Sequence, residues 1–409
     1  MNKLLIKGAR IINPVKNMDS VGDILLQNGK ITAVGGKIAC EAAQIIDAQG
    51  LIAAPGLVDM HVHLRDPGFT YKEDIISGCK AAAAGGVTSL LAMPNTSPVT
   101  DTPETVSMIL EKAQNADARV YVAAAITHGL KSEQLCDLAA LKNAGAIALS
   151  DDGRPVENTA LMAQAMMQAP QLNLKIVSHC EDLDLAKAGF PYAAEDCGTA
   201  REIALASTFD VPVHICHVST AASAALIRDA KLRGVQVTAE TAPHYFMLTE
   251  KELQHHDADY RMNPPLRTEE DRLAIIEAVM DGTIDAIATD HAPHSEEEKA
   301  DFLTAPNGSI GMETSLAVGI TALVKDDCLD LSQLIERMSV NPAYILGIDA
   351  GTLNVGAPAD VVLFDENEEW TVDETKLHGK SRNTPFKGLT LTGKVKMTIC
   401  RGEIVYTDK

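Results

Sequence analysis

Short apolar runs alternate with Ala-rich segments of helical length from Pro55 to about Asn341. Each run has the character of a buried strand, and strands that alternate with helices are typical of repeated βα units around a parallel sheet. Eight such units predict a closed (β/α)₈ barrel. The eight runs are GLVDMHVH, VTSLLAMP, RVYVAAAI, AIALSDD, KIVSHC, VPVHICHV, VQVTAETAP and IDAIATDHA.

Helices are predicted between these runs, for example over residues 72–86, 223–234 and 269–282. Each of these segments ends in glycine, which is typical of a helix C-cap because glycine adopts the left-handed backbone without steric penalty. The longest loops are expected after the seventh and eighth strands, over residues 260–268 and 295–312. Loops on that face of a barrel carry its chemistry.

The two ends of the chain have the pattern of short β-strands instead. The predicted strands cover residues 4–12, 23–27, 30–35, 359–365, 394–400 and 403–407. Asn28-Gly29 is a strong two-residue hairpin signal, and Arg401-Gly402 marks a second turn. We therefore predict an α/β protein in which a barrel, residues 54–345, is joined by one small β domain built from residues 1–53 and 346–409.

The composition agrees with this architecture and excludes some partners. The 409 residues suffice for one barrel and a smaller companion, since a barrel takes roughly 250 to 300 residues. With 46% hydrophobic and 22% charged residues, the chain is typical of a soluble globular protein. The net charge of -21 argues against a nucleic-acid partner, which requires clustered Lys and Arg.

No segment indicates a membrane or secreted protein. No stretch approaches the roughly 20 apolar residues of a membrane span, and the N-terminus lacks the features of a signal peptide. The eight cysteines contain no CxxC pair, which fits reduced thiols, and we expect a cytoplasmic protein. For Cys180 and Cys216, which lie beside histidines, a packed strand thiol is favoured over metal ligation.

Polar residues stand at the ends of five of the eight apolar runs, on the face where barrel enzymes place catalytic groups. They are His61 and His63 in the first run, Asp151 and Asp152 in the fourth, His179 in the fifth, His217 in the sixth and Asp290 in the eighth. Residues i and i+2 of a strand point to the same side, so His61 and His63 can share one cation. Packing alone does not explain such a pattern, and we predict a metal centre.

Imidazole and carboxylate ligands suit Zn²⁺, with Mn²⁺ and Fe²⁺ as competitors. Four histidines and two aspartates suffice for two ions, and a carboxylate at the end of the fourth strand can bridge them. The sixth strand also contains His214, three residues before His217. This spacing places the two rings on opposite faces of a regular strand. We expect His217 to be the ligand and His214 a hydrogen-bonded core residue or a support for the site.

Seven motifs together resemble the bacterial type I dihydroorotases of the amidohydrolase superfamily. They are HVHLRDPG (61–68), MPNT (93–96), SDDG (150–153), SHCED (178–182), HICHVST (214–220), NPPLR (263–267) and ATDHAPH (288–294). The resemblance covers essentially the whole chain. HVH and DHAPH are shared with hydantoinases and allantoinases, whereas LRDPG, DDG and NPPLR in combination favour dihydroorotase.

The resemblance implies a role for each candidate ligand. One zinc ion would be held by His61, His63 and Asp290, the other by His179 and His217, with Asp152 as the bridge and Asp290 also as general acid and base. Many relatives bridge their metals with a carbamylated lysine at the end of the fourth strand. The segment ALSDDG contains no lysine, which favours Asp152 and disfavours hydantoinase and allantoinase.

The resemblance also implies a substrate-binding set. Arg65, Asn95 and His294 would contact the substrate carboxylate, with Asn263, Asn307 and Gly308 near the ring. An arginine fork matches a carboxylate through two hydrogen bonds; a surface salt bridge is the alternative for Arg65. The segment between His179 and His217 is shorter than expected for the family, and His244 either supports the site or is polar packing.

The implied reaction is the reversible, zinc-dependent cyclisation of N-carbamoyl-L-aspartate to (S)-dihydroorotate and water, a step of pyrimidine biosynthesis. One alternative is another cyclic amidase, hydantoinase or allantoinase, whose uncharged substrates have little use for Arg65. The other is a non-catalytic scaffold for aspartate transcarbamoylase, which has no reason to keep six ligands. The expected partners are a small-molecule substrate, other copies of the chain in a homo-oligomer and, as an option, aspartate transcarbamoylase.

Overall fold

The centre of the molecule is a barrel of eight parallel strands. The computed structural model describes residues 3–40 and 43–408. The barrel strands are β6 (Leu57–Val62), β7 (Val87–Ala92), β8 (Arg119–Ala124), β9 (Ala148–Leu149), β10 (Lys175–Ser178), β11 (Val213–Ile215), β12 (Val237–Thr241) and β13 (Ala286–Ile287). Each pairs with the next in chain order, and a parallel bridge between Val62 and His291 brings the last and first strands together. The predicted barrel and its eight strands are confirmed.

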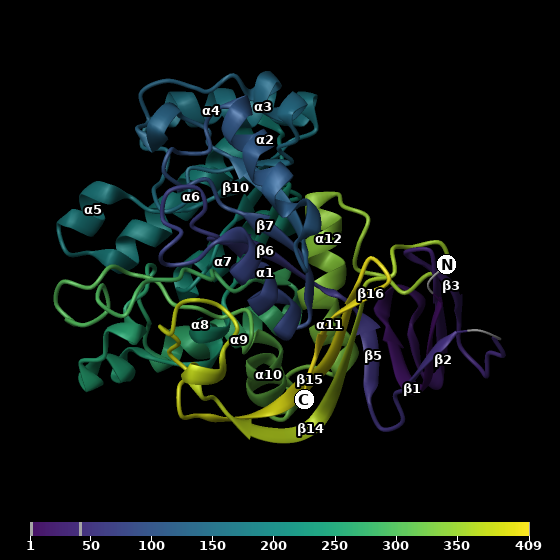
Figure 1. Cartoon of the computed structure of the whole chain (residues 1–409). Coiled ribbons are helices and arrows are strands. Elements are labelled where there is room, and N and C mark those ends of the chain that lie inside the picture. The colour runs from purple at the N-terminus through teal and green to yellow at the C-terminus, as the bar shows by residue number, and fades with distance from the viewer. Residues whose placement is uncertain (1–2, 41–42, 409) are drawn as a thin grey trace.

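Helices alternate with the strands and surround the barrel (Figure 1). They are α1 (Ile75–Ala84), α2 (Pro103–Lys112), α3 (Leu138–Ala144), α4 (Thr159–Gln168), α5 (Leu183–Lys187), α6 (Pro191–Phe209), α7 (Ala221–Leu232), α8 (Pro243–Met247), α9 (Glu269–Asp281), α10 (Ser315–Gly319), α11 (Leu331–Ile335) and α12 (Asn341–Leu346). Two π-helical turns, Ile320–Val324 and Glu336–Val340, continue α10 and α11. Between His179 and His217, the chain forms α5 and α6.

The ends of the predicted helices follow local hydrogen bonding. The helix predicted from residue 72 begins at Ile75, because Asp74 and Ser77 form a capping box at its N-terminus. The helix predicted over residues 269–282 is confirmed as α9, which ends before Gly282 in the left-handed conformation, with φ of 81°. The apolar period located both helices, and side-chain capping determined where the first begins.

A second sheet combines the two ends of the chain. Its strands are β1 (Lys3–Asn13), β2 (Met18–Gln27), β3 (Lys30–Val34), β4 (Gln44–Asp47), β5 (Ile52–Pro55), β14 (Val361–Thr371), β15 (Thr390–Cys400) and β16 (Glu403–Thr407). Their order is β16-β15-β14-β5-β1-β2-β3, with β4 paired to β1. The antiparallel pair of β5 and β14 joins the N-terminal to the C-terminal strands. The predicted β structure from both chain ends is confirmed, and its exact limits stay a prediction.

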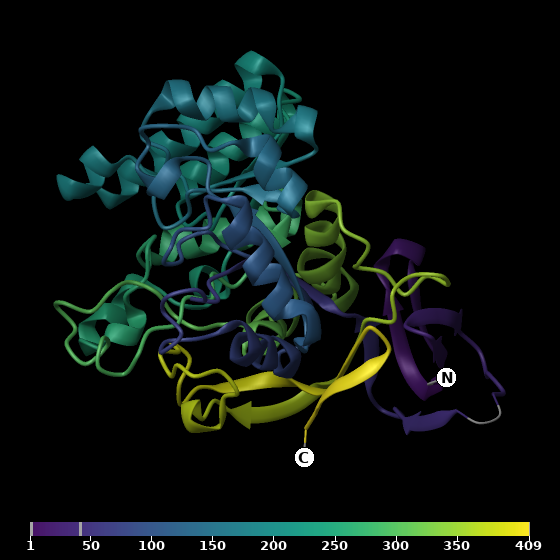
Figure 2. The ribbon, with the colours of Figure 1, turned by 45° about the horizontal axis from the view of Figure 1, so that its top comes forward.

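The second sheet packs in two directions. Its N-terminal strands share a separate core with β14, which includes Ile6, Ile24 and Val361. The hairpin of β14 and β15 instead buries Phe364 and Val395 in the large cluster that the barrel and its helices form. Figure 2 shows this hairpin, in yellow, beneath the barrel and the purple N-terminal strands to one side. The C-terminal strands therefore belong to both parts of the molecule.

The barrel interior is packed with side chains along most of its length. Val58, Met60, Leu91, Ala123 and Val177 form one buried apolar cluster there. The candidate ligands lie at or just beyond the C-terminal ends of the strands, where loops supply further partners. Among the described residues, no helix combines the length and the apolar character needed to cross a membrane.

Candidate metal centre

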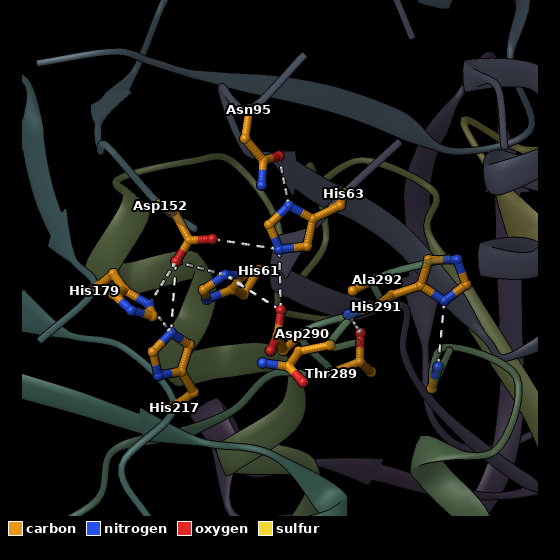
Figure 3. A network of polar contacts seen from close by, with 12 residues as sticks. His61, His63, Asn95, Asp152, His179, His217, Thr289, Asp290, His291 and Ala292 are labelled. Carbon is orange, nitrogen blue, oxygen red and sulfur yellow. Dashed lines mark hydrogen bonds and ion pairs between the residues drawn. The ribbon is translucent and has the colours of Figure 1, made fainter. Parts of the chain in front are cut away.

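The six candidate ligands meet at the C-terminal end of the barrel (Figure 3). His61 is in β6, and the others lie just beyond strand ends: His63 after β6, Asp152 after β9, His179 after β10, His217 after β11 and Asp290 after β13. All six are buried, with Asp290 the most accessible at 8%. Residues that are far apart in the sequence thus form one compact cluster.

The first group of ligand atoms belongs to β6 and the end of β13. His63 Nε2 lies 3.0 Å from Asp290 Oδ1, and His61 Nε2 lies 3.6 Å from the same oxygen. The ligand atoms of these three residues all lie within 4.8 Å of one another. Their spacing is that of a group able to hold one metal ion.

The second group consists of Asp152, His179 and His217. Asp152 Oδ1 lies 3.6 Å from His179 Nδ1 and 3.5 Å from His217 Nε2. The same carboxylate also contacts the first group, with Oδ1 at 3.2 Å from His61 Nε2 and Oδ2 at 3.3 Å from His63 Nε2. Asp152 therefore stands between the two groups, as a bridging ligand must.

The chemistry of these residues fits a bound cation. His61 Nε2 and Asp152 Oδ1 are buried side-chain atoms without a hydrogen-bond partner among the described residues, and leaving such atoms unpaired is costly. Burial alone would lower the pKa of His61, but the charge of Asp152 raises that pKa well above its ordinary value. Surroundings that favour a proton on this ring also favour a metal ion beside it. Nitrogen and carboxylate donors in these numbers suit zinc.

A third group joins Cys216 to His61 and Asp152, with ligand atoms within the same 4.8 Å. Burial raises the pKa of the Cys216 thiol well above its ordinary value, so the neutral form is favoured. The metal ligand is the thiolate. Cys216 is also part of the apolar cluster in the barrel interior, as expected for a packed thiol.

Three residues of the site have a left-handed backbone. The φ angles are 60° for Arg65, 36° for His217 and 48° for Asp290. Non-glycine residues rarely adopt this conformation, and the strain is tolerated where the surrounding structure fixes it. Since β11 ends at Ile215, strand alternation does not extend to His217, and Cys216 and His217 both reach Asp152. Strand alternation therefore does not determine the direction of the His217 side chain.

His214 remains within the strand and is buried, as predicted for a core histidine. Its Nδ1 lies 2.8 Å from the Thr238 hydroxyl. His244 is also buried, and burial lowers its pKa to about 4, so its ring is neutral at pH 7. The structure thus places both as buried polar groups near the six candidate ligands.

Four of the predicted substrate-binding residues lie together beside the first ligand group. This set, called the wall below, consists of Arg65, His294, Asn307 and Gly308. Arg65 Nε donates to the Pro293 carbonyl at 3.1 Å, and its guanidinium lies 3.4 Å from His294 Nε2. The His294 ring donates from Nε2 to the Asn307 carbonyl at 2.9 Å. A Cβ at Gly308 would lie 3.1 Å from this ring, so glycine permits the close approach.

The charge states of this wall suit an anion. Burial lowers the pKa of Arg65 to about 10, which leaves the guanidinium protonated at pH 7. Burial, with Arg65 and Lys72 nearby, lowers the pKa of His294 to about 3, so that ring is neutral. The buried Arg65 guanidinium, held just beyond the end of β6, is therefore suited to bind a carboxylate.

Of the two remaining predicted residues, Asn95 contacts a candidate ligand and Asn263 reaches one through Glu181. The Asn95 side-chain oxygen is 2.8 Å from His63 Nδ1, and Asn263 donates its amide to Glu181 at 3.3 Å. Glu181 in turn lies 3.0 Å from His179 Nε2. Both amides are therefore held beside the candidate metal centre.

Sequence reasoning missed several charged residues that contact the candidate site or its supporting residues. Glu240 lies 2.7 Å from His61 Nδ1, and Asp59 accepts hydrogen bonds from the Thr289 amide and hydroxyl at 3.1 and 2.6 Å. Lys72 lies 3.2 Å from His294 Nδ1. Glu240 could have been found, because it is a charged residue near the end of the seventh apolar run. Asp59 stands within the first apolar run and gives the same signal, whereas Lys72 has none.

Comparison with known proteins places this site in a family. The model of the amidohydrolase family matches residues 52–405. The chain belongs to the amidohydrolase family. It is 49% identical to a dihydroorotase from Geobacter metallireducens and 47% identical to one from Acetivibrio thermocellus. The first match covers 98% of this chain and 99% of the relative, and the second covers 99% of both.

Solved structures of other amidohydrolases have the same fold. An L-hydantoinase from Arthrobacter aurescens matches with a TM-score of 0.91 and 25% identity, covering 100% of this chain and 96% of its own. A dihydropyrimidinase from Brevibacillus agri matches with a TM-score of 0.89 and 26% identity, covering 100% and 95%. The resemblance to bacterial dihydroorotases within this superfamily is confirmed, and the chain is a cyclic amide hydrolase by its family.

Proposed function

We propose that this amidohydrolase is a zinc-dependent dihydroorotase, which interconverts N-carbamoyl-L-aspartate and (S)-dihydroorotate in pyrimidine biosynthesis. The position of Asp152 carries the proposal, because this carboxylate contacts His61, His63, His179 and His217 at 3.2 to 3.6 Å. A bridging aspartate distinguishes the centre from one built on a carbamylated lysine. The nearly full-length similarity to proteins named dihydroorotase supports the same conclusion.

Two metal ions are proposed, one held by His61, His63 and Asp290 and the other by His179 and His217, with Asp152 shared. Bound zinc lowers the pKa of a water ligand toward about 7 and polarises a carbonyl group. The protein would supply the fixed ligand geometry and the buried surroundings that make such ions effective.

Asp290 is proposed to carry the proton. Burial alone would raise its pKa, but the hydrogen bond with His63 and the charge of His61 hold that pKa well below its ordinary value. The carboxylate is therefore ionised at neutral pH and can accept a proton from the attacking water. It then passes this proton to the ring nitrogen as the amide bond breaks, and in the reverse direction it returns the proton.

Arg65 is proposed to bind the substrate carboxylate, with Asn95 and His294 beside it and Asn263, Asn307 and Gly308 near the ring. Its backbone strain and its bond to the Pro293 carbonyl fix the guanidinium against the ligand cluster. Lys72 adds a second cation beside His294. With these cations, the site would bind a substrate ring that carries a carboxylate in preference to an uncharged ring.

Replacing Arg65 by Met tests that preference. We expect the KM for dihydroorotate to rise by about 10- to 100-fold, since a charge-assisted hydrogen bond contributes roughly 1.5 to 3 kcal/mol. Turnover of the uncharged ring dihydrouracil, measured in the same preparation, serves as the control and is expected to change little. An equal loss for both rings would make Arg65 a structural residue.

The function itself is tested by assaying the zinc-loaded protein on dihydroorotate, hydantoin and allantoin, together with its metal content. We expect turnover of dihydroorotate but not of hydantoin or allantoin, and about two zinc ions per chain. Faster turnover of hydantoin would favour the hydantoinase alternative, to which the similar solved structures belong. Catalysis of none of the three by metal-loaded protein would favour the scaffold alternative.

Self-association and an aspartate transcarbamoylase partner are further proposals that rest on the family resemblance. The mass of the purified protein in solution, alone and mixed with a transcarbamoylase, checks both.

A further inference from the structure

Glu240 is a buried carboxylate near the end of β12 that the proposed reaction does not use. The residue is only 1% exposed. Its Oε1 lies 2.7 Å from His61 Nδ1, and its Oε2 lies 3.3 Å from His214 Nε2. A buried charge is strongly disfavoured unless it is paired and hydrogen-bonded. Glu240 thus connects a candidate metal ligand to a histidine outside the metal centre.

The contact with Glu240 determines which His61 nitrogen carries the proton. A carboxylate only accepts hydrogen bonds, so the hydrogen of the neutral ring lies on Nδ1. The lone pair is then on Nε2, which is 3.2 Å from Asp152 Oδ1 and 3.6 Å from Asp290 Oδ1. Nε2 has no hydrogen-bond partner in the described part of the chain. The nitrogen that faces both aspartates is therefore the one free to bind a cation.

His214 lies on the other side of Glu240, with its Nε2 within ion-pair distance of Oε2. The strand register pairs His214 with Thr238, and Glu240 follows two positions later, on the same face of β12. The Thr238 hydroxyl lies 2.8 Å from His214 Nδ1 and can donate to it, which leaves Nε2 to carry hydrogen toward Glu240. The three side chains form a polar column that runs from Thr238 up to His61.

The lower end of this column borders a cavity of about 510 Å³, lined by His214 and Thr238 together with the first residues of β10, β11 and β12. These are strand starts, so the cavity lies at the end of the barrel opposite the metal centre. A smaller side chain at His214 would face this space, which makes the position suitable for substitution.

We propose that Glu240 is a positioning residue of the metal centre, which fixes His61 as a ligand through Nε2 and is itself held by His214. A carboxylate behind a ligating histidine orients the ring and raises its basicity. Loss of such a partner typically weakens metal binding by about 10- to 100-fold. The inference rests on the metal centre of the proposed function, but it concerns metal binding without substrate.

The experiment compares Co²⁺ binding by the wild-type chain, Glu240→Gln, His214→Asn and the double variant, each stripped of metal and free of substrate. Titration against a competing chelator gives the affinity, and visible absorption of bound Co²⁺ reports its coordination. We expect Glu240→Gln to weaken binding by about 10- to 100-fold and to alter the spectrum. His214→Asn should have a smaller effect, and the double variant should be no weaker than Glu240→Gln alone.

Glu202→Gln is the matched control, because Glu202 is a fully buried glutamate in α6 whose contacts are Ser178 and Arg201. It should keep the wild-type Co²⁺ affinity. An unchanged affinity and spectrum in folded Glu240→Gln would overturn the proposal, and so would an equal loss in Glu202→Gln. If Glu240→Gln does not fold, wild-type binding by His214→Asn overturns it instead.

A parallel assay separates this inference from the proposed function. Wild-type protein that binds Co²⁺ in a Glu240-dependent way but does not turn over dihydroorotate would contradict the function and retain the positioning role. Wild-type protein that turns over dihydroorotate, combined with an unchanged metal affinity in Glu240→Gln, would support the function and contradict the positioning role.

Discussion

Asp152→Asn is expected to lose metal and activity together. The carboxylate contacts both ligand groups. Burial alone would raise its pKa, but the charge of His61 and the contacts with His179 and His217 hold that pKa well below the ordinary range. An uncharged amide can neither bridge two cations nor offset their mutual repulsion. We expect the metal affinity to fall by more than the roughly 10- to 100-fold that follows loss of a group behind a ligand. Metal content after dialysis and turnover of dihydroorotate measure the effect.

Asp151→Asn is the matched control, because the neighbouring carboxylate has a different task. Asp151 accepts from the Ile126 and Thr127 amides at 2.7 and 3.0 Å and from the Thr127 hydroxyl. It therefore holds the loop after β8, and an amide oxygen can keep part of this network. We expect metal to be retained and the free energy of unfolding to fall by about 1 kcal/mol. Retention of both metals by Asp152→Asn would assign the bridge to another group.

The barrel and the candidate ligands could be predicted from the sequence because both depend on short-range patterns. A buried strand followed by a helix gives a repeated apolar signal, and a polar residue at its end is conspicuous. His61, His179 and Asp290 were identified in this way. The structure brings them together, since the C-terminal ends of parallel barrel strands converge on one face. Their role as ligands stays a prediction that metal analysis will test.

Contacts between distant strands could not be predicted in the same way. Asp59 is two residues before His61, yet it accepts hydrogen bonds from Thr289 in the strand that closes the barrel. The pairing depends on barrel closure, which no local pattern describes. The same holds for Glu240, whose partner His61 lies 179 positions away along the chain.

The exact course of the backbone beyond the strand ends was also outside the reach of periodicity. Alternation predicts side-chain direction only while a strand continues, and β11 stops at Ile215. The left-handed backbone at His217 then redirects its ring toward Asp152. Such a conformation persists only when the surrounding contacts enforce it, and these contacts come from the complete fold.

Asp290→Asn is expected to slow the reaction in both directions while the fold is retained. The substitution keeps the size of the side chain and one oxygen beside His63, but it removes the group that accepts and returns the proton. General acid and base catalysis contributes roughly 10² to 10⁴-fold, and turnover should fall within that range for hydrolysis and for cyclisation alike. Initial rates from dihydroorotate and from N-carbamoyl-aspartate, at saturating zinc, measure the effect.

Because Asp290 is also a candidate ligand, the metal content of the same samples determines how the loss is interpreted. With two zinc ions still bound, a loss of turnover in both directions assigns the proton to Asp290. If one ion is lost along with the activity, raising the free zinc concentration should restore binding before the rates are compared. A zinc-loaded Asp290→Asn protein with a near-normal rate would remove this residue from the proton path.

The left-handed backbone at Asp290 makes a second, local test available, since Asn tolerates this conformation as well as Asp does. A loss of turnover without a loss of thermal stability is therefore expected, and it separates the proton role from a structural one.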